Sequence, residues 1–143
     1  GYEFDLLGLE EDTCGKIRRF NEMYRETEDL VLQGDLYRLY DGPYWQAYMQ
    51  VSKDKRRARL TFLLIRARMG MEYVHIRLDG LDTNKTYIND RNNLRLSGDA
   101  LMKAGILISD LNCPHETNAG KELFFNEVKQ SGGGMQIVFE SED

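Results

Sequence analysis

The spacing of apolar residues changes at Gly34, and this change constrains the fold more than any other feature of the 143-residue chain. Between residues 13 and 33 proline is absent, large apolar side chains recur at helical spacing, and charged residues fall on the opposite side. The apolar positions are Ile17, Phe20, Tyr24 and Val31, and the charged positions are Arg18, Glu22, Arg25 and Asp29. The pattern predicts one amphipathic helix, which we expect Gly34 to end in the left-handed conformation that glycine adopts without a steric clash.

After Gly34 the apolar residues alternate with polar ones, as in half-buried strands. Two such runs, Trp45 to Val51 and Ala58 to Leu64, flank the polar segment 52–55 and predict a β-hairpin. Polar loops are expected at 112–120 and 131–134. Further strands are predicted at 73–78, 85–89, 106–109, 123–128 and 135–139. About seven short strands separated by turn residues indicate a mainly β fold, an antiparallel β-sandwich preceded by one long amphipathic helix.

Composition limits the function classes open to such a chain. Hydrophobic residues make up 41% and charged residues 30%, which is typical of one globular domain with a short appendage. A net charge of −5 argues against a nucleic-acid partner, because neutralising phosphates requires a surplus of Lys and Arg. No run of 18 apolar residues is present, so no membrane segment is predicted. The first residue is Gly1 rather than Met, which we interpret as the start of a fragment or of a processed product.

Residue types that commonly carry chemistry occur without the spacing that chemistry requires. Cys14 and Cys113 lie far apart and predict two unpaired thiols in a reducing, cytoplasmic compartment. His75 and His115 have no partner at ligand spacing, so neither a metal nor a cofactor is expected. The closest acidic pair between strands, in the segment 79–82, is interpreted as turn chemistry in which Asp side chains cap backbone N–H groups.

Two clusters and a glycine run allow both a structural and a functional interpretation. The basic residues between Lys53 and Arg59 are interpreted as a solvated hairpin tip rather than as a nucleic-acid contact. Gly132 to Gly134 lack a phosphate-binding lysine and are interpreted as a hairpin connection. The aromatic residues Tyr44, Trp45 and Tyr48 are either packing residues or a platform on which sugar rings stack.

Five segments, taken in order, resemble the C-terminal part of the α-galactosidases of glycoside hydrolase family thirty-six. They are Gly-Tyr-Glu-Phe-Asp-Leu at 1–6, Gln-Gly-Asp-Leu-Tyr-Arg-Leu at 33–39, Trp45 to Val51 with the turn Ser-Lys-Asp-Lys at 52–55, Leu-Asp-Gly-Leu-Asp at 78–82 with Tyr87, and Leu-Ser-Gly-Asp-Ala-Leu-Met-Lys-Ala-Gly-Ile at 96–106. The segments together cover most of the chain, which makes the resemblance specific.

This resemblance implies that residues 1–34 are the closing strand and last helix of a (β/α)₈ barrel and that residues 35–143 are the C-terminal antiparallel β-sandwich. The implied parent is a retaining enzyme that removes terminal α-linked galactose with two aspartates and no metal. Both aspartates would lie upstream of Gly1, so none of the residues in this chain is expected to be catalytic.

Two hypotheses about function follow. In the first, the chain is an accessory domain whose partner is the barrel of the parent and which meets galactosides only through that parent. In the second, it is an autonomous carbohydrate-binding module that uses Tyr44, Trp45 or Tyr48. In either case the apolar face of the helix must dock on the β-domain, pair with a second copy in a homo-oligomer, or fray.

Overall fold

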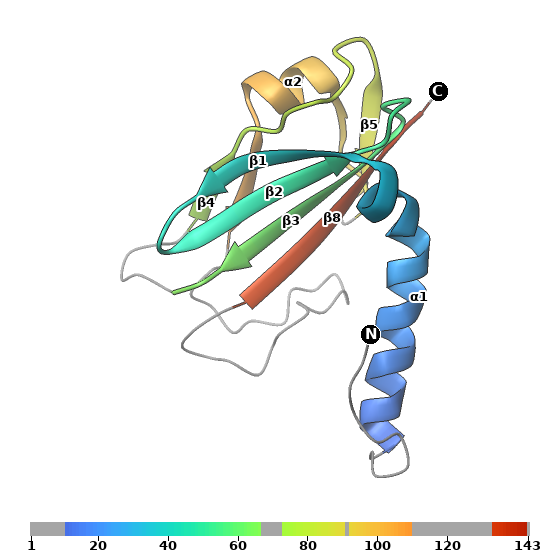
Figure 1. The fold of residues 1–143 in the computed structure, drawn as a ribbon. Helices are drawn as coiled ribbons and strands as arrows, with labels where there is room; N and C mark the ends of the chain where they lie inside the picture. Colours follow the sequence, from blue (N-terminus) through green and yellow to red (C-terminus); the bar gives the residue numbers. More distant parts are fainter. Residues whose placement is uncertain (1–10, 67–72, 91, 110–132, 143) are drawn as a thin grey trace.

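The computed structural model describes residues 11–66, 73–90, 92–109 and 133–142. It has the predicted mainly β fold, preceded in sequence by one long helix (Figure 1). Helix α1 spans Glu11–Gln33 and α2 spans Gly98–Lys103. The strands are β1 (Asp35–Asp41), β2 (Trp45–Val51), β3 (Arg57–Leu64), β4 (Tyr73–Ile76), β5 (Thr86–Asn89), β6 (Arg95–Ser97), β7 (Ile106–Ser109) and β8 (Gly133–Ser141).

The strands form two antiparallel sheets that enclose the core. The larger sheet has the order β1-β2-β3-β8-β5-β6, so the last strand is inserted between β3 and β5, and the smaller sheet pairs β4 with β7. Buried residues of both sheets and of α2 make one apolar cluster, which includes Met49, Leu60, Ile76, Leu101 and Phe139. The predicted β-sandwich is therefore confirmed. We call the face of the larger sheet that points away from this cluster the outer face.

The β2–β3 hairpin is confirmed in detail. Met49 lies opposite Leu60 and Ala47 lies opposite Phe62, which places the apolar positions of both strands on the core face. In the connecting turn the Asp54 carboxylate accepts hydrogen bonds from the Ser52 hydroxyl at 2.6 Å and from the Arg56 backbone N–H at 3.0 Å. These bonds stabilise the charged carboxylate and hold the pKa of Asp54 below its usual range.

Several predicted boundaries were wrong where local pattern and tertiary pairing disagree. Strands β1 and β6 and helix α2 were not predicted, and β4 and β5 are shorter than expected. The predicted loop 131–134 overlaps β8, because Gly133 and Gly134 pair with Leu64 and Leu63. The predicted strand 123–128 and loop 112–120, together with Cys113 and His115, lie outside the described residues.

The end of α1 differs from the expectation for Gly34. The glycines with positive φ among the described residues are Gly80 and Gly105, so Gly34 is not left-handed. Its N–H continues the helix by bonding to the Leu30 carbonyl oxygen at 3.1 Å. A Cβ atom at Gly34 would lie 2.4 Å from that oxygen and 3.0 Å from the Val51 carbonyl oxygen. Glycine is therefore required mainly by the carbonyl oxygen in the last turn of α1 itself, with the β2 backbone as a second, looser contact.

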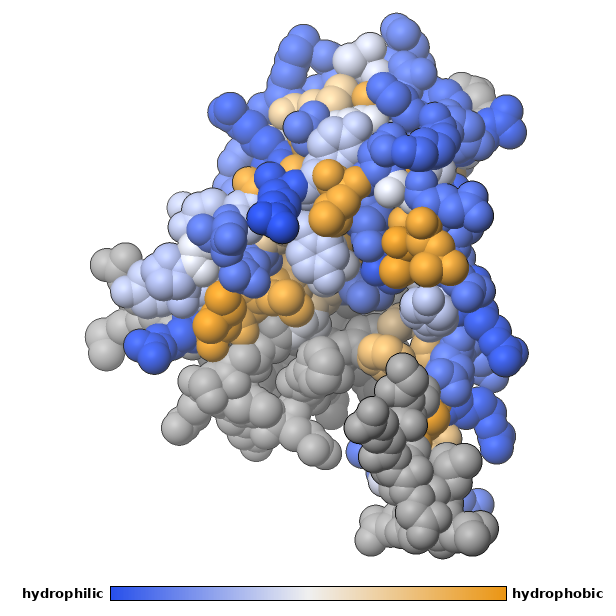
Figure 2. All heavy atoms as spheres, in the orientation of Figure 1, coloured by the Kyte–Doolittle hydropathy of each residue, from blue (hydrophilic) through white to orange (hydrophobic). Residues whose placement is uncertain are grey.

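The predicted apolar face of α1 is also not the face that the structure buries. Thr27 and Leu30 are buried, whereas Phe20 and Tyr24 remain 40% and 39% exposed. Figure 1 shows the reason: only the end of α1 lies beside the larger sheet, and most of the helix extends past it. On the face shown in Figure 2, hydrophobic residues near the end of α1 and over the sheet form separate patches with hydrophilic residues between them. Neither described helix combines the length and apolar character needed to cross a membrane.

Candidate functional site at the junction of the long helix and the sheet

Trp45, one of the three predicted sugar-stacking residues, is packed between other aromatic rings. Its ring stacks on that of Tyr40, with centroids 3.7 Å apart and planes inclined by 18°, and its centroid lies 5.8 Å from that of Phe62. The side chain is partly buried against the apolar core. One face of the indole is therefore already covered by Tyr40.

Tyr48 does not extend Trp45 into a single platform. Tyr48 has the opposite parity to Trp45 in β2, so its side chain lies on the outer face of the sheet. Tyr44 precedes β2, and its carbonyl oxygen accepts hydrogen bonds from the N–H groups of Ile65 at 2.8 Å and Arg66 at 3.0 Å. Sugar binding by any of the three stays a prediction, and it could not use Trp45 and Tyr48 together on one face of the sheet.

The basic residues at the β2–β3 hairpin fall into two groups, one exposed to solvent and one in contact with α1. Lys53, Lys55 and Arg56 are exposed at the hairpin tip, as predicted. Arg57, in contrast, contacts α1: Nη1 lies 3.1 Å from a carboxylate oxygen of Asp29, and Nη2 donates to the Glu26 carbonyl oxygen at 2.6 Å. Its Nε lies 3.3 Å from the Glu140 carboxylate of β8. Interpreting the entire run as a solvated tip was therefore wrong for Arg57.

Arg59, also predicted to be solvated, is only 7% exposed beneath α1. Its Nε and Nη2 donate to the Gln50 side-chain oxygen at 3.0 and 2.8 Å, and its Nη1 donates to the Thr27 hydroxyl at 2.9 Å. Burial lowers the pKa of Arg59, while the hydroxyls of Tyr48 and Tyr24 act against this shift. The sequence signal was available but weak: Arg59 stands between the core positions Ala58 and Leu60, in the middle of a strand.

A second buried polar group lies on the same face as Arg59. Thr61 is 3% exposed and follows Arg59 by two positions in β3, so both side chains lie on the outer face. Its hydroxyl has no hydrogen-bond partner within the described structure. A buried hydroxyl without a partner is uncommon in folded proteins and requires an explanation.

The acidic segment 79–82 is a turn, as predicted. The Asp79 carboxylate accepts from the Gly80 N–H at 2.7 Å, and the Asp82 carboxylate accepts from the Asn84 N–H at 2.9 Å. Gly80 adopts a φ of 79°, which only glycine tolerates easily. His75 is exposed on β4 and its ring contacts the Ala104 carbonyl oxygen. Within the described ranges no group of His, Cys, Asp and Glu side chains is arranged to hold a metal.

The segment 96–106 also has a structural role at each of its distinctive positions. Ser97 caps α2 by accepting the Ala100 N–H at 3.1 Å. A Cβ atom at Gly98 would lie 2.0 Å from the Asp82 carbonyl oxygen, and Gly105 leaves the helix with a φ of 77°. Leu101 completes the core. These residues fix α2 against the 79–82 turn.

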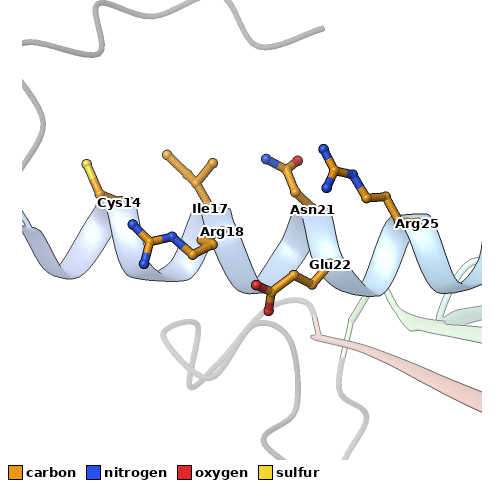
Figure 3. A pocket seen from close by; sticks show the side chains of 6 residues that line it. All are labelled: Cys14, Ile17, Arg18, Asn21, Glu22 and Arg25. Carbon is orange, nitrogen blue, oxygen red and sulfur yellow. The ribbon is translucent and has the colours of Figure 1, made fainter.

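A shallow surface depression lies on the free part of α1 (Figure 3). Its lining residues are Cys14, Ile17, Arg18, Asn21, Glu22 and Arg25. All six come from a single helix, and no second described element contributes a polar group that converges on them. The depression therefore lacks the convergent groups of a typical ligand site.

Comparison with known proteins assigns this architecture to a family. Residues 45–123 match the family model described as the glycosyl hydrolase family 36 C-terminal domain. The bifunctional α-galactosidase/sucrose kinase AgaSK of Mediterraneibacter gnavus is 29% identical over 135 residues, covering 92% of this chain and 14% of that protein. The α-galactosidase AgaA of Geobacillus stearothermophilus is 31% identical over 111 residues, covering 76% of this chain and 15% of AgaA.

A solved structure agrees with these sequence relatives. The galactosidase domain of AgaSK superposes with a TM-score of 0.77 and 25% identity, covering 99% of this chain and 18% of that one. The chain thus spans only 14% to 18% of the length of the proteins it matches.

Proposed function

The chain belongs to the glycosyl hydrolase family 36 C-terminal domain family, and we propose that it is the accessory domain of a retaining α-galactosidase acting on terminal α-linked galactose in oligosaccharides. The match over residues 45–123 carries this proposal, since it includes β2 to β7. The sequence relatives reported above are named α-galactosidases, and each is several times longer than the matched part. We further propose that residues 1–34 complete a (β/α)₈ barrel, that residues 35–143 form the sandwich beside it, and that both catalytic aspartates lie upstream.

The contacts of α1 support a role in holding two units together. Arg57 and Arg59 bind the end of the helix through Asp29 and Thr27, while Leu30 is fully buried at the same junction. The remainder of α1 leaves Phe20 and Tyr24 about 40% exposed. Apolar side chains on a helix favour burial against a further surface. A helix fixed to the sandwich at one end and packed on a barrel along its length would set the position of one unit relative to the other.

This function is tested in the complete parent protein. One version keeps residues 35–143, and a second version ends after Gly34. We expect the second to lose thermal stability and hydrolysis of a chromogenic α-galactoside, and the isolated 143-residue chain to show no hydrolysis, because it lacks a positioned nucleophile and acid/base pair. Full activity and an unchanged melting temperature after truncation, or turnover by the isolated chain, would contradict the proposal.

In the isolated chain, the exposed aromatic residues of α1 have a second way to become buried, which is pairing with another copy. Sedimentation of the 143-residue chain and of a version that starts at Asp35 measures this directly. A concentration-dependent dimer that becomes monomeric on deletion of the helix supports pairing through α1. Monomers in both samples would show that α1 needs the remainder of a longer protein as its partner.

A further inference from the structure

We infer that the larger sheet itself, and not only α1, contacts the barrel of the parent enzyme, at an apolar corner between α1 and the outer face of the sheet. The apolar corner consists of Phe20 and Tyr24 on α1, Leu36 on β1 and Tyr48 on β2. Its occupant is an apolar helix of the barrel. This inference rests on the proposed function and goes beyond it, because there α1 alone was given a contact with the barrel.

The sheet side of the apolar corner is set by strand register. Leu36 lies opposite Gln50 of β2, whose side chain is on the outer face and accepts hydrogen bonds from Arg59. Tyr48 precedes Gln50 by two positions, so its side chain is on the same face and diagonal to Leu36. Leu36 is 57% exposed and Tyr48 is partly exposed. Two neighbouring side chains of the outer face are therefore accessible to a partner.

The helix side follows from the contacts that dock α1. On one flank of the helix, Asp29 and the Glu26 carbonyl oxygen bind Arg57, which also pairs with Glu140 of β8. Since β8 and β2 lie on opposite sides of β3, this flank is turned away from β2 and β1. Tyr24 precedes Asp29 by five residues, which is about 140° around an α-helix. Tyr24 therefore lies on the other flank, toward β2 and β1.

The buried side chain of Arg59 joins the two sides of the corner. It donates to Gln50 on the sheet and to the Thr27 hydroxyl on α1. Tyr48 is two positions from Gln50 in its strand, and Tyr24 is one helical turn from Thr27. The hydroxyls of both tyrosines are close enough to the guanidinium to affect its pKa. The two tyrosines therefore belong to one surface around Arg59.

The geometry of helix packing extends this surface to the sheet. Phe20 and Tyr24, one turn apart, are 40% and 39% exposed on the part of α1 that extends past the sheet (Figure 1). A helix packed on their flank would have its axis about 8 to 10 Å from that of α1. Neighbouring strands are about 4.8 Å apart, so this distance spans roughly two strands. Because α1 lies over β2 and β3, the packed helix would lie over β1 and contact Leu36.

The character of the corner and the length of the relatives favour the barrel as its occupant. Large apolar and aromatic side chains at the centre, with the exposed Arg38 opposite Tyr48 at the edge, are typical of a protein interface. This chain matches a C-terminal domain and only 14% to 15% of the length of the α-galactosidases reported above. The preceding part of such a parent would meet the sandwich along α1, which borders the corner.

Hydroxyl-radical footprinting tests the contact by comparing side-chain labelling in the isolated 143-residue chain and in the complete enzyme. We expect Leu36 and Tyr24 to lose most of their labelling in the complete enzyme. Leu107 and Tyr73 are matched controls, because they are 60% and 61% exposed on the smaller sheet and should be labelled equally in both proteins. Equal labelling of Leu36 in the two proteins would overturn the inference. So would a Leu36 that is already protected in the isolated chain, since its cover would then belong to this chain.

A photo-cross-linking residue, p-benzoylphenylalanine, in place of Leu36 identifies the occupant in the complete enzyme. The enzyme is assembled from equal amounts of unlabelled and ¹⁵N-labelled chains. We expect cross-links to peptides that precede Gly1, always between peptides of the same isotope. Cross-links between the two isotopes would show that a second copy fills the corner and would exclude the barrel of the same chain.

A stability measurement gives an independent check. Leu36→Ser should leave the melting temperature of the isolated chain unchanged and lower that of the complete enzyme, whereas Leu107→Ser should change neither. The truncation after Gly34 tests the proposed function separately. If truncation abolishes stability and hydrolysis while Leu36 stays fully labelled, the accessory role stands and the contact is confined to α1, which overturns this inference alone.

Discussion

The hydroxyl of Tyr87 donates a hydrogen bond of 2.7 Å to the carbonyl oxygen of Lys55, 32 positions away. The same hydroxyl accepts the Asp82 N–H at 3.0 Å. Lys55 has a φ of 56°, an uncommon value for a residue with a side chain, so the β2–β3 turn is held by a contact from outside the hairpin. One buried phenol therefore joins this turn to the 79–82 turn, which gives Tyr87 a structural role.

Tyr87→Phe should destabilise the chain by about 1 to 3 kcal/mol, because it removes one hydroxyl and leaves two backbone groups without their partner. The free energy of unfolding from urea titration measures the loss. Tyr73→Phe is the matched control, since Tyr73 is exposed on β4. Equal effects of the two substitutions would show that the Tyr87 hydroxyl does not fix the two turns.

The same bond predicts a dependence on alkaline pH. Burial raises the pKa of Tyr87 above its ordinary value of about 10. Below pH 10 the phenol is neutral in both states and its full contribution is present. Above pH 10 the unfolded chain loses this proton first, so that contribution declines as pH rises through the folded pKa. The difference in unfolding free energy between the wild type and Tyr87→Phe should therefore stay constant below about pH 10 and shrink as the pH rises above it, and a constant difference throughout would contradict this account.

Strands with one apolar face were predictable from the sequence, whereas edge elements were not. In β2 and β3 alternate residues enter the core, so the period of two is visible in the sequence. Strand β1 lies at the edge of the sheet and is exposed at five of seven positions, so it lacks that signal. The insertion of β8 between β3 and β5 depends on pairing between distant segments, which no local pattern encodes.

The junction of α1 with the sheet was missed for a related reason. Arg57 and Arg59 look like surface residues in the local sequence, because the helix that covers them lies about 30 positions earlier in the chain. The stacking of Tyr40 on Trp45 likewise depends on the β1–β2 register, which shifts between Arg38 and Tyr40. The turn chemistry of Asp79 and Asp82, in contrast, depends on neighbours in sequence and was predicted correctly.

Two glycines of α1 should respond to alanine in opposite ways. Gly15→Ala should stabilise the chain by up to about 1 kcal/mol, because the site is exposed, has no heavy atom within 4 Å of the added Cβ, and alanine favours the helix. Gly34→Ala should destabilise it by about 1 to 3 kcal/mol, because the Cβ would meet the Leu30 carbonyl oxygen at 2.4 Å. Circular dichroism during thermal unfolding measures both changes. Similar shifts of the same sign would indicate that the chain does not leave α1 at Gly34 with this close approach to the Leu30 carbonyl oxygen.

Trp45 provides a direct test of the carbohydrate-binding alternative, because it is the only tryptophan in the chain. With Tyr40 stacked on one face, we expect no saturable change in its fluorescence when galactose or raffinose is added. Trp45→Ala should instead cost about 3 kcal/mol of stability, the lower end for a large aromatic residue, since the side chain is partly buried. A saturable response to sugar combined with an unchanged unfolding midpoint would favour the binding module.

Leu30 and Leu32 test the docking of α1 on the sheet, because they are close in sequence and differ in burial. Leu30 is 0% exposed at the end of α1, and it lies outside the main core cluster, so its burial depends on the contact between the helix and the sheet. Leu30→Ala should therefore cost about 2 to 5 kcal/mol, from lost transfer free energy and the cavity that remains. Leu32 is 66% exposed, and Leu32→Ala should change the unfolding free energy by less than about 0.5 kcal/mol.

Urea unfolding followed at 222 nm gives the stability of both leucine variants, and amide hydrogen exchange locates the change. If the junction is formed as described, Leu30→Ala should speed exchange in the last turns of α1 more than in β5 or β8, because those strands contact the main core rather than the helix. Matching losses for Leu30→Ala and Leu32→Ala would mean that neither side chain is held by the sheet. In that case α1 would be attached to the sandwich only through the polar contacts of Arg57 and Arg59.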